Sequence, residues 1–567
     1  MKYFIHSILF SLFFVSATAQ QVPFVYEQLQ AEMKISMLCL SNDSLQGRLV
    51  GSPGEKIAYT YISQKFQQYN VQPKGEQKYL QPFTLKRFSV YTEGTFFDLK
   101  KGGRKLTFIG SYPKLFPASV SGPGKAKAKT VFMGYGIISG DGSMDDYAGK
   151  TVKGKIVVFQ SGYPSSTFSI HSAVAAASSL EAKVDTAIAR GAIGVLVLHV
   201  DTSAAVPRYK KYVQKNQSRN IPVMHFITQS ETDLFDRAEL LLDVRANEVE
   251  IVGHNVVGYI DNKAQKTVVI GAHYDHLGYD EFGNSTWRPD ANEAQQIHNG
   301  ADDNASGTTA LITLAGTLSK YGSKNLNYCF IAFSGEEEGL LGSNYFVKHP
   351  TIDMKHVLAM INMDMVGRLD EQKYTLGING TGTSKEWNSL LGTITIDSLK
   401  YKYTESGTGA SDHTSFYNDS IPVLHYFTGT HYDYHKPSDD EEKINYDGMF
   451  KVVKHIYLLT EKLSATPQLN FVRTKEDTSA RISFKVTLGI MPDYMYEGKG
   501  VKIDGVTPDK PAAVAGIQKG DCILKLGNIS IDTMQDYMKA LAAFKKGDRT
   551  TVEINRAGNI LIKEVIF

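Results

Sequence analysis

Four short apolar runs constrain the fold of this chain more than any other feature. The runs cover residues 268–272, 328–333, 357–361 and 421–427. Each is rich in β-branched or aromatic residues and is unbroken rather than alternating, which is typical of a strand buried on both faces. A helical pattern at residues 308–318 lies between the first two runs. This alternation predicts an α/β fold, with a mostly parallel sheet flanked by helices on both sides.

Acidic and histidine side chains lie at or just beyond the ends of these runs. Ligands of an open α/β sheet gather beyond the carboxyl ends of its strands, so we expect these side chains to converge. They are His273, Asp303, Glu336, Glu337, Asp364 and His435. Taken singly, each is explained as well by a turn, a cap or a charge near a helix N-terminus. The set as a whole indicates a functional site.

Two histidines with several carboxylates are ligands suited to Zn²⁺, and a close pair of metal ions needs one carboxylate that bridges both. Asp303 is the expected bridge, because it lies in a tight turn directly before a helix. We expect one metal to take His273 and Asp364, and the other to take Glu337 and His435. Each metal keeps open positions for water, which is typical of a catalytic rather than a structural site.

Two further carboxylates have expected roles beside the metals. Glu336 and Glu337 are adjacent, so one of them can bind metal while the other faces water. We expect Glu336 to be the general base and then the proton donor to the leaving amine. Asp275 lies two residues after His273, where its carboxylate can accept the free ring N–H of that histidine.

Five segments of the chain together resemble the dinuclear zinc aminopeptidase family, which is related to glutamate carboxypeptidase and to the transferrin receptor ectodomain. The segments are residues 273–275, 300–307, 335–340, 362–365 and 435–439. The resemblance implies a zinc-peptidase (phosphorylase/hydrolase-like) fold, two Zn²⁺ ions per chain, and a peptide or protein substrate with a free N-terminus.

The family pattern also bears on individual residues. It places the bridging ligand on the second aspartate, so the role passes to Asp303 and not to Asp302, and the 303–304 peptide bond is often cis in relatives. A tyrosine directly before the last histidine, here Tyr434, stabilises the tetrahedral intermediate in some members and is expected to be catalytic. Four nearby residues fit pocket wall or outer partners as well as they fit ligands, and they are not part of the expected metal set: His276, Asp412, His413 and His431.

Two other parts of the chain resemble known modules. Residues 131–137, 146–147, 152–158 and 189–195 resemble a protease-associated (PA) domain, β-rich and inserted in the peptidase. Residues 488–490, 506–512, 515–517 and 520–524 resemble a PDZ domain, whose main-chain N–H groups near residues 488–490 are expected to capture a C-terminal peptide. The expected domains are a signal peptide (1–19), the first part of the peptidase domain (20–115), the inserted PA domain (116–251), the catalytic domain (252–465), a linker (466–479) and the small C-terminal PDZ domain (480–567).

The first residues predict export to a periplasm or beyond. Lys2 is followed by an apolar stretch at residues 8–15, too short to span a bilayer, and by a small-residue cleavage signal at 17–19. We therefore expect no membrane span in the mature chain. The formal net charge of +2 gives no electrostatic reason to expect a nucleic-acid partner. The three cysteines are expected to be small buried hydrophobic residues: Cys39, Cys329 and Cys522.

The residues leave some alternatives open. A carboxypeptidase or a glutaminyl cyclase of the same fold is the nearest one, and a carboxypeptidase needs a cationic clamp that Arg288 or Arg368 can supply. A binding protein with an inactive peptidase fold is another, although receptor-type relatives have lost metal ligands that this chain retains. Residues 279–298 form a polar insert that either covers the cleft or is only a solvated loop.

Overall fold

The structure is a computed structural model of the chain. It describes residues 26–168, 172–200, 209–214, 218–229, 232–287, 296–474, 486–492, 496, 499–506, 510–531, 537, 540–541, 544 and 548–567. The expected signal peptide, Arg288 and residues 475–479 of the expected linker lie outside these residues. None of the helices in the described part of the chain has the length and apolar character of a membrane span.

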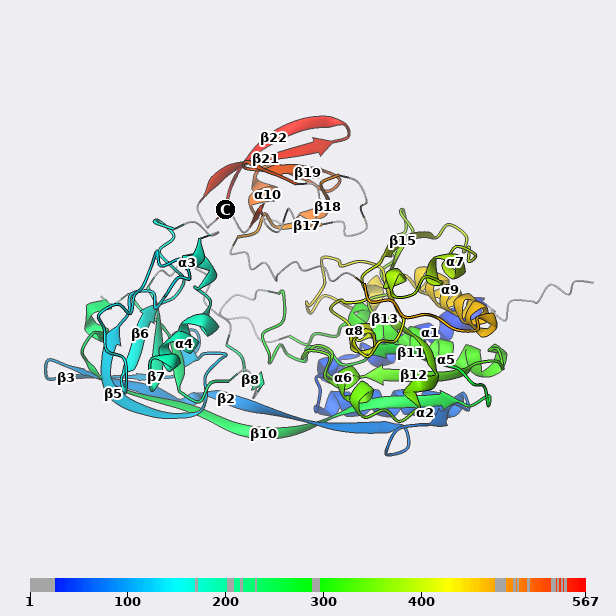
Figure 1. The fold of residues 1–567 in the computed structure, drawn as a ribbon, viewed down its shortest axis with the longest axis horizontal. Helices are drawn as coiled ribbons and strands as arrows, with labels where there is room; N and C mark the ends of the chain where they lie inside the picture. Colours follow the sequence, from blue (N-terminus) through cyan, green and yellow to red (C-terminus); the bar gives the residue numbers. More distant parts are fainter. Residues whose placement is uncertain are drawn as a thin grey trace, which may run out of the picture.

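A main lobe, an inserted lobe and a C-terminal domain make up the molecule (Figure 1). The centre of the main lobe is a set of four parallel strands in the order β16-β13-β11-β12. They are β11 (Thr267–His273), β12 (Asn327–Phe333), β13 (Val357–Met363) and β16 (Val423–Phe427). The sheet continues through β14 (Thr375–Asn379) to β15 (Lys400–Thr404) on one side and to β10 (Glu239–Ile260) on the other. Since β10 and β14 pair antiparallel with their neighbours, the sheet is mixed.

Helices cover both faces of this sheet. One face packs on α1 (Tyr26–Leu40), α2 (Pro53–Gln68), α5 (Gly307–Tyr321), α7 (Trp387–Leu391) and α9 (Tyr446–Ala465). The other packs on α6 (Leu341–Lys348) and α8 (His413–Asn418). Successive residues of β11 point to opposite faces, so Val268 and Ile270 join the first core and Val269 joins the second. This explains the unbroken apolar run, and the expected parallel-centred α/β fold is confirmed.

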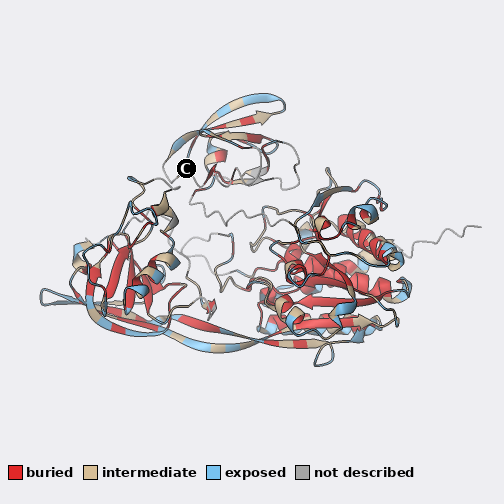
Figure 2. Cartoon of the chain, viewed as in Figure 1, coloured by how far each residue is buried: buried red, intermediate tan, exposed pale blue. Residues whose placement is uncertain are grey.

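Two long strands carry the chain from the main lobe into the inserted lobe (Figure 1). β2 (Leu80–Lys101) and β10 are each 22 residues long and pair antiparallel along most of their length. The inserted lobe adds a partly parallel sheet in the order β5-β6-β7-β9-β4. Its elements are β3 (Arg104–Ile109), β4 (Leu115–Pro117), β5 (Gly124–Phe132), β6 (Ile156–Gln160), α3 (Ala173–Ala176), α4 (Leu180–Ala189), β7 (Gly194–His199), β8 (Tyr212–Gln214) and β9 (Val223–Ile227). Figure 2 shows that buried residues concentrate in the strands of both lobes.

The C-terminal domain is a small antiparallel sheet around its own apolar core. Its elements are β17 (Ile490–Pro492), β18 (Val501–Val506), α10 (Pro511–Val514), β19 (Cys522–Leu526), β20 (Ile529–Ser530), β21 (Arg549–Arg556) and β22 (Asn559–Ile566). Lys402 of β15 donates a hydrogen bond to the main-chain oxygen of Tyr496, which joins this domain to the main lobe.

Some sequence-based expectations differ from the structure. The expected first part of the peptidase domain is not all of one type, because α2 ends at Gln68 and the chain from residue 80 is strand. The expected domain limit at 251/252 falls inside β10, and Phe97 and Leu115 pack in the core of the inserted lobe. All three cysteines are free, but Cys39 is exposed rather than buried. It lies on α1, beside residues that face the core, on the side of the helix that does not.

Candidate metal centre

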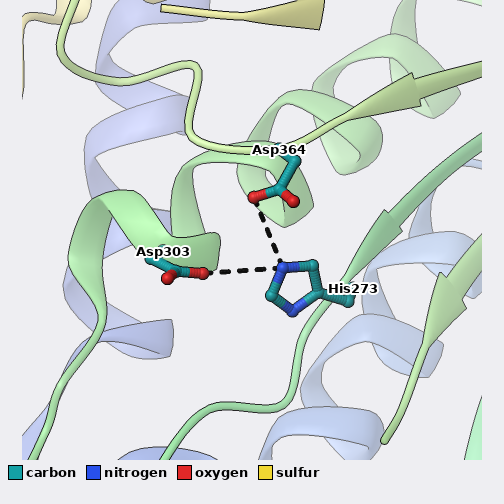
Figure 3. Close-up of side chains that lie close together, drawn as sticks. All are labelled: His273, Asp303 and Asp364. Carbon is teal, nitrogen blue, oxygen red and sulfur yellow. Dashed lines mark ion pairs between the residues drawn. The ribbon is translucent and has the colours of Figure 1, made fainter. Parts of the chain in front are cut away.

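Three of the expected ligands meet beyond the carboxyl ends of the central strands (Figure 3). His273 is the last residue of β11, Asp303 lies in the turn before α5, and Asp364 directly follows β13. The Nε2 atom of His273 is 3.5 Å from Oδ1 of Asp303 and 3.4 Å from Oδ1 of Asp364. His273 and Asp303 are buried, and Asp364 is half-buried.

The other two expected ligands lie on the opposite side of Asp303. The Nε2 atom of His435 is 3.2 Å from Oδ2 of Asp303 and 3.3 Å from Oε2 of Glu337. The Oδ1 atom of Asp303 is thus near one histidine and its Oδ2 atom near the other. His276, which is not one of the expected ligands, also approaches this group, with Nδ1 2.7 Å from Oε1 of Glu337. One carboxylate therefore connects two separate groups of donor atoms.

The spacing and chemistry of these donors fit divalent zinc. Nitrogen and oxygen ligands lie about 2.0–2.2 Å from Zn²⁺ in a tetrahedral site, which puts neighbouring ligand atoms about 3.4 Å apart. The four distances from His273 and His435 to their carboxylates lie between 3.2 and 3.5 Å. Among the described residues, two sets of donors lie close enough for an ion: His273, Asp303 and Asp364, and His276, Asp303 and Glu337.

The electrostatics of the cluster also favour cations. Burial raises the pKa of Glu336 well above its ordinary value; Asp364 and Glu337 raise it further, while His273 opposes the shift. Burial likewise raises the pKa of Asp275. Burial alone would lower the pKa of His435, but Glu337 and Asp303 raise it to about 12. Such a concentration of buried acidic groups is stabilised by positive charge, and divalent ions bound by neutral imidazoles supply it.

Asp439 contacts the turn that carries Asp303 from outside. The Oδ2 atom of Asp439 accepts hydrogen bonds from the main-chain N–H groups of Asp302 (2.9 Å) and Asp303 (3.1 Å). The main-chain oxygen of Asp439 also accepts from Ala301. Gly300 begins the turn at a φ of +55°, and a Cβ atom there would lie 2.0 Å from the main-chain oxygen of Asp303. The turn therefore requires a glycine at residue 300 and the carboxylate of Asp439, which is distant from the turn in sequence.

Asp302 and Asn304 flank Asp303 but have other roles in the structure. Oδ1 of Asp302 accepts from the main-chain N–H of Gly367, and Oδ2 lies 3.1 Å from Nε2 of His431. The peptide bond between Asp303 and Asn304 is cis. The side chain of Asn304 bonds to the main chain of Met363 and Met365, next to Asp364. Each neighbour of Asp303 thus ties the turn to the loop after β13.

Asp275 differs from the expectation. Nδ1 of His273 is 3.2 Å from the main-chain oxygen of Asp275, whereas its distance to the carboxylate is 3.7 Å, beyond hydrogen-bond range. The carboxylate of Asp275 instead accepts from the main-chain N–H groups of Glu336 (3.2 Å) and Glu337 (3.4 Å). The segment after β11 turns sharply enough for the carbonyl to reach the ring, which leaves the carboxylate to hold the loop after β12.

The described part of the insert at residues 279–298 packs against the metal centre. The main-chain oxygen of Asn284 accepts a hydrogen bond from Nδ1 of His435 at 3.0 Å, and Thr286 donates from its main-chain nitrogen to the main-chain oxygen of His435 at 2.8 Å. His435 has a φ of +55°, a strained conformation for a residue other than glycine. These contacts fix its ring, so this part of the insert is not merely a solvated loop.

Glu336 and Tyr434, both expected to be catalytic, border the same space. Oε2 of Glu336 is 3.9 Å from Nε2 of His273. The ring of Tyr434 stacks on that of His435 with centroids 3.9 Å apart. Burial, together with Asp303 and Glu337, raises the pKa of the Tyr434 hydroxyl far above neutrality, so this hydroxyl keeps its proton.

Buried arginines, which the sequence analysis did not single out, support the loops around the centre. Arg48 is buried and bonds to the main-chain oxygens of Tyr274, Asn299 and Gly300. Arg87 of β2 forms a buried ion pair with Glu338 at 3.1 Å. Neither arginine belongs to a sequence motif that contains the metal ligands. Only the fold brings each arginine close to the metal centre.

Comparisons with family models divide the chain in the same way. Residues 255–460 match peptidase family M28, residues 127–233 match the PA domain, and residues 469–565 match the PDZ domain. The expected PA and PDZ domains are thereby confirmed.

Curated relatives match part of the chain. A probable leucine aminopeptidase of Arthroderma benhamiae is 29% identical over 217 residues, which is 36% of this chain and 57% of that protein. The aminopeptidase YwaD of Bacillus subtilis is 28% identical over 281 residues, 46% of this chain and 55% of that protein. The chain thus spans little more than half the length of these relatives.

A solved structure supports the fold. The aminopeptidase from Aneurinibacillus sp. strain AM-1 superposes with a TM-score of 0.52 at 21% sequence identity, over 78% of this chain and 95% of that chain. The family matches, the sheet and the donor set agree on one classification. The chain contains a peptidase domain of family M28, with an inserted PA domain and a C-terminal PDZ domain.

Proposed function

We propose that the protein is an aminopeptidase that hydrolyses the N-terminal peptide bond of peptides with two zinc ions bridged by Asp303. The observation that carries this proposal is the division of the Asp303 carboxylate between two histidines, 3.5 Å from His273 through Oδ1 and 3.2 Å from His435 through Oδ2. The names of the curated relatives and the family of the main lobe support the same activity.

Each donor group has a place in this proposal. His273 and Asp364 would hold one ion, Glu337 and His435 would hold the other, and Asp303 would be shared between them. When bound, such paired ions polarise the scissile carbonyl and lower the pKa of a water molecule. Glu337 keeps its negative charge for this role, because His435 and His276 lower its pKa well below the ordinary value even though burial opposes the shift.

Glu336 is the proposed proton carrier. Its carboxylate takes a proton from the attacking water and delivers it to the nitrogen of the leaving amine. Burial raises its pKa above the ordinary value, so this carboxylate holds a proton more readily than a solvated glutamate does. Asp275 positions it by accepting the main-chain N–H of Glu336.

Tyr434 is the proposed donor to the substrate oxygen. Its hydroxyl stays protonated at neutral pH because burial and nearby carboxylates raise its pKa. A protonated phenol beside the site donates a hydrogen bond to the negative charge that develops on the carbonyl oxygen. Stacking on His435 fixes the direction of the ring.

The site gives less support to a carboxypeptidase than to an aminopeptidase. A carboxypeptidase requires a cation that is available to the substrate carboxylate, but Arg368 is 3.1 Å from Asp433 and is engaged in that ion pair. Arg288, the other candidate clamp, lies outside the described residues. An inactive binding protein would not require the complete donor set found here.

Substrate chemistry tests the proposal directly. Purified protein should release amines from a panel of aminoacyl fluorogenic substrates, should leave the N-acetylated counterparts intact, and should lose activity with a chelator and regain it with zinc. Equal hydrolysis of acetylated and free substrates would exclude an aminopeptidase. Activity that survives complete removal of divalent metal would exclude the metal mechanism.

We further propose that residues 1–19 act as an export signal and that the PDZ domain binds a peptide C-terminus near residues 488–490. The first part is supported by the sequence pattern, and N-terminal sequencing of the mature protein should begin at Gln20. The second is supported by the PDZ match and by the φ of +73° at Gly489, which suits an open main-chain loop. Free and C-terminally amidated peptides should differ in affinity for the domain.

A further inference from the structure

A well-formed cavity lies in the inserted lobe, and none of the proposed metal ligands lines it. Its volume is about 390 Å³. It lies beyond the carboxyl ends of parallel strands, where Ser161 and Gly162 follow β6 and His199 ends β7. The lobe and its parallel strands are seen at the left of Figure 1. Open parallel sheets bind ligands in this position.

Two lysines line this cavity. Lys183 of α4 is only 1% exposed, and its Nζ donates to the main-chain oxygens of Gln160 (3.2 Å) and Gly162. These carbonyls hold the ammonium group in the cavity wall, in the first turn of a ten-residue helix, where the helix dipole adds positive potential. Lys210 is half-buried and lines the cavity from another segment. Glu181 is also part of the lining, but it is exposed.

A pair of buried histidines forms another part of the wall. Nε2 of His199 and Nδ1 of His225 are 2.9 Å apart, and the two residues are 6% and 4% exposed. Burial lowers the pKa of His199 to about 4, with Lys183 adding to the shift, and lowers that of His225 to about 3. Both rings are therefore neutral at physiological pH.

The neutral pair has a defined hydrogen-bonding capacity. One ring donates to the other, so whichever tautomers are present, one of the two outer ring nitrogens carries a proton and the other carries a lone pair. Neither outer nitrogen has a hydrogen-bond partner among the described residues. The cavity thus contains a fixed N–H donor and a fixed acceptor beside the lysines.

Apolar side chains complete the wall, chiefly Phe159, Leu180 and Val197. An inorganic anion would make no use of such a surface, whereas an organic acid with an apolar body would bury against it. We propose that this cavity binds the carboxylate of a small organic molecule with an apolar body, held by Lys183 and Lys210 and by the outer N–H of the His199–His225 pair.

The cavity is connected to the metal centre through the insert. Gly283 lines the cavity, and the next residue, Asn284, accepts the hydrogen bond from Nδ1 of His435. An occupant therefore lies against the loop that orients a proposed metal ligand. Two sources of the carboxylate fit this position: the C-terminus of a peptide, a reading that rests on the proposed function, or a free acylated or unmodified amino acid.

Calorimetric titration of the zinc-loaded full chain tests the site without any turnover. The probes are N-acetyl-leucine, N-acetyl-leucinamide and inorganic phosphate. We expect N-acetyl-leucine to bind at least about tenfold more tightly than its amide, because a charge-assisted pair with lysine is lost in the amide. Phosphate should bind more weakly than N-acetyl-leucine, because it gains nothing from the apolar wall. Equal affinity for acid and amide, or tighter binding of phosphate, would overturn the proposal.

Variants separate this cavity from the metal centre, where a carboxylate can also bind. Lys210→Gln and His225→Asn should each weaken N-acetyl-leucine at least about tenfold, while Lys153→Gln, at an exposed lysine of the same lobe that does not line the cavity, should leave it unchanged. Wild-type affinity in both cavity variants would refute the site. Lys183 is unsuitable as the first test, because it is buried and its loss threatens folding.

The source of the carboxylate follows from kinetics. If it belongs to the peptide, kcat/KM for trileucine should exceed that for trileucine amide, and Lys210→Gln should abolish this preference. If it belongs to a free acid, the two peptides should be cleaved equally while the titration still shows the acid-specific site. The titration measures binding without hydrolysis. It therefore still tests the carboxylate site if the protein proves not to be an aminopeptidase.

Discussion

Both lobes have a polar site at the ends of parallel strands, but the charged side chains at the two sites have opposite sign. In each lobe, parallel strands end at a polar site, β11, β12 and β13 in the main lobe and β6, β7 and β9 in the inserted lobe. Carboxylates surround the histidines of the main lobe, whereas lysines accompany those of the inserted lobe. Topology therefore determines where a ligand binds, and the side chains at the strand ends determine its charge.

Histidine responds differently in the two surroundings. Glu337 and Asp303 raise the pKa of His435 to about 12 against the effect of burial. At His225, burial lowers the pKa to about 3, and no carboxylate opposes the shift. The first environment favours a cation, either a proton or a metal ion. The second keeps the imidazole neutral and leaves an anion to be bound by lysine.

The strongest test of the acidic site is Glu336→Gln. We expect kcat to fall at least about a hundredfold, the usual scale for loss of a general base, while zinc content is unchanged because Glu336 is not one of the proposed ligands. Steady-state kinetics together with metal analysis of the purified variant provides the measurement.

Glu338, two residues away, is the internal control. Its carboxylate is 3.1 Å from Arg87, and burial raises its pKa to about 7. Glu338→Gln should lower thermal stability by weakening this ion pair and should reduce kcat far less than Glu336→Gln does. Near-normal turnover in Glu336→Gln, or equal losses in both variants, would contradict the assignment of the base.

A second test asks which histidine completes the second ion site. His435 approaches Glu337 and Asp303 at 3.3 and 3.2 Å, whereas His276 is 2.7 Å from Glu337 and 4.0 Å from Asp303. We expect His435→Ala to bind one zinc ion instead of two, with second-site affinity reduced by about a hundredfold or more. His276→Ala should retain both ions with a smaller loss, about 10- to 100-fold, as for an outer partner. If His276→Ala loses more zinc affinity than His435→Ala, then His276 is the ligand and His435 is the outer partner.

The sequence alone was sufficient for the positions of the strands and for the residues that gather at their ends. Each unbroken apolar run became a strand with one face toward each core, because period-two alternation is absent when both faces are buried. The convergence of His273, Asp303 and Asp364 followed from topology, since parallel strands end at one edge of the sheet. These inferences need only local patterns.

Contacts that join distant segments were not predictable in this way. The Asp439 carboxylate holds a turn more than 130 residues earlier, and the main-chain oxygen of Asn284 orients a ring about 150 residues later. Every residue type has a main-chain oxygen, so the sequence does not indicate which residue supplies such an acceptor. The cavity of the inserted lobe was missed for a related reason, because Lys183, His199 and His225 lie on separate elements and form no recognisable spacing.

Asp439→Ala tests the importance of one such distant contact. The substitution removes the acceptor of the main-chain N–H groups of Asp302 and Asp303, so the bridging carboxylate should become less well ordered. We expect zinc affinity to fall about 10- to 100-fold, as for loss of an outer partner, with a parallel loss of activity at limiting zinc. Asp440→Ala is the matched control, because its carboxylate bonds to Asn299 and not to the turn. Identical zinc affinities in the two variants would show that Asp439 does not order the bridging carboxylate.

The smallest effect that we expect is a pH dependence confined to the inserted lobe. In the unfolded chain His199 and His225 bind protons below about pH 6.5, whereas in the folded lobe burial holds their pKa values at about 4 and about 3. The unfolded state therefore binds more protons between pH 6.5 and 4, and stability is lost as pH falls through this window. At pH 5.5 the loss should be about 1 kcal/mol for each imidazole. Hydrogen exchange of β7 and β9, corrected for the intrinsic rate, should show protection that decreases from pH 6.5 to 4.5, and His225→Asn should remove part of this decrease. If protection of both strands is constant over this range, the histidines are protonated in the folded lobe, and the neutral donor pair on which the carboxylate site depends does not exist.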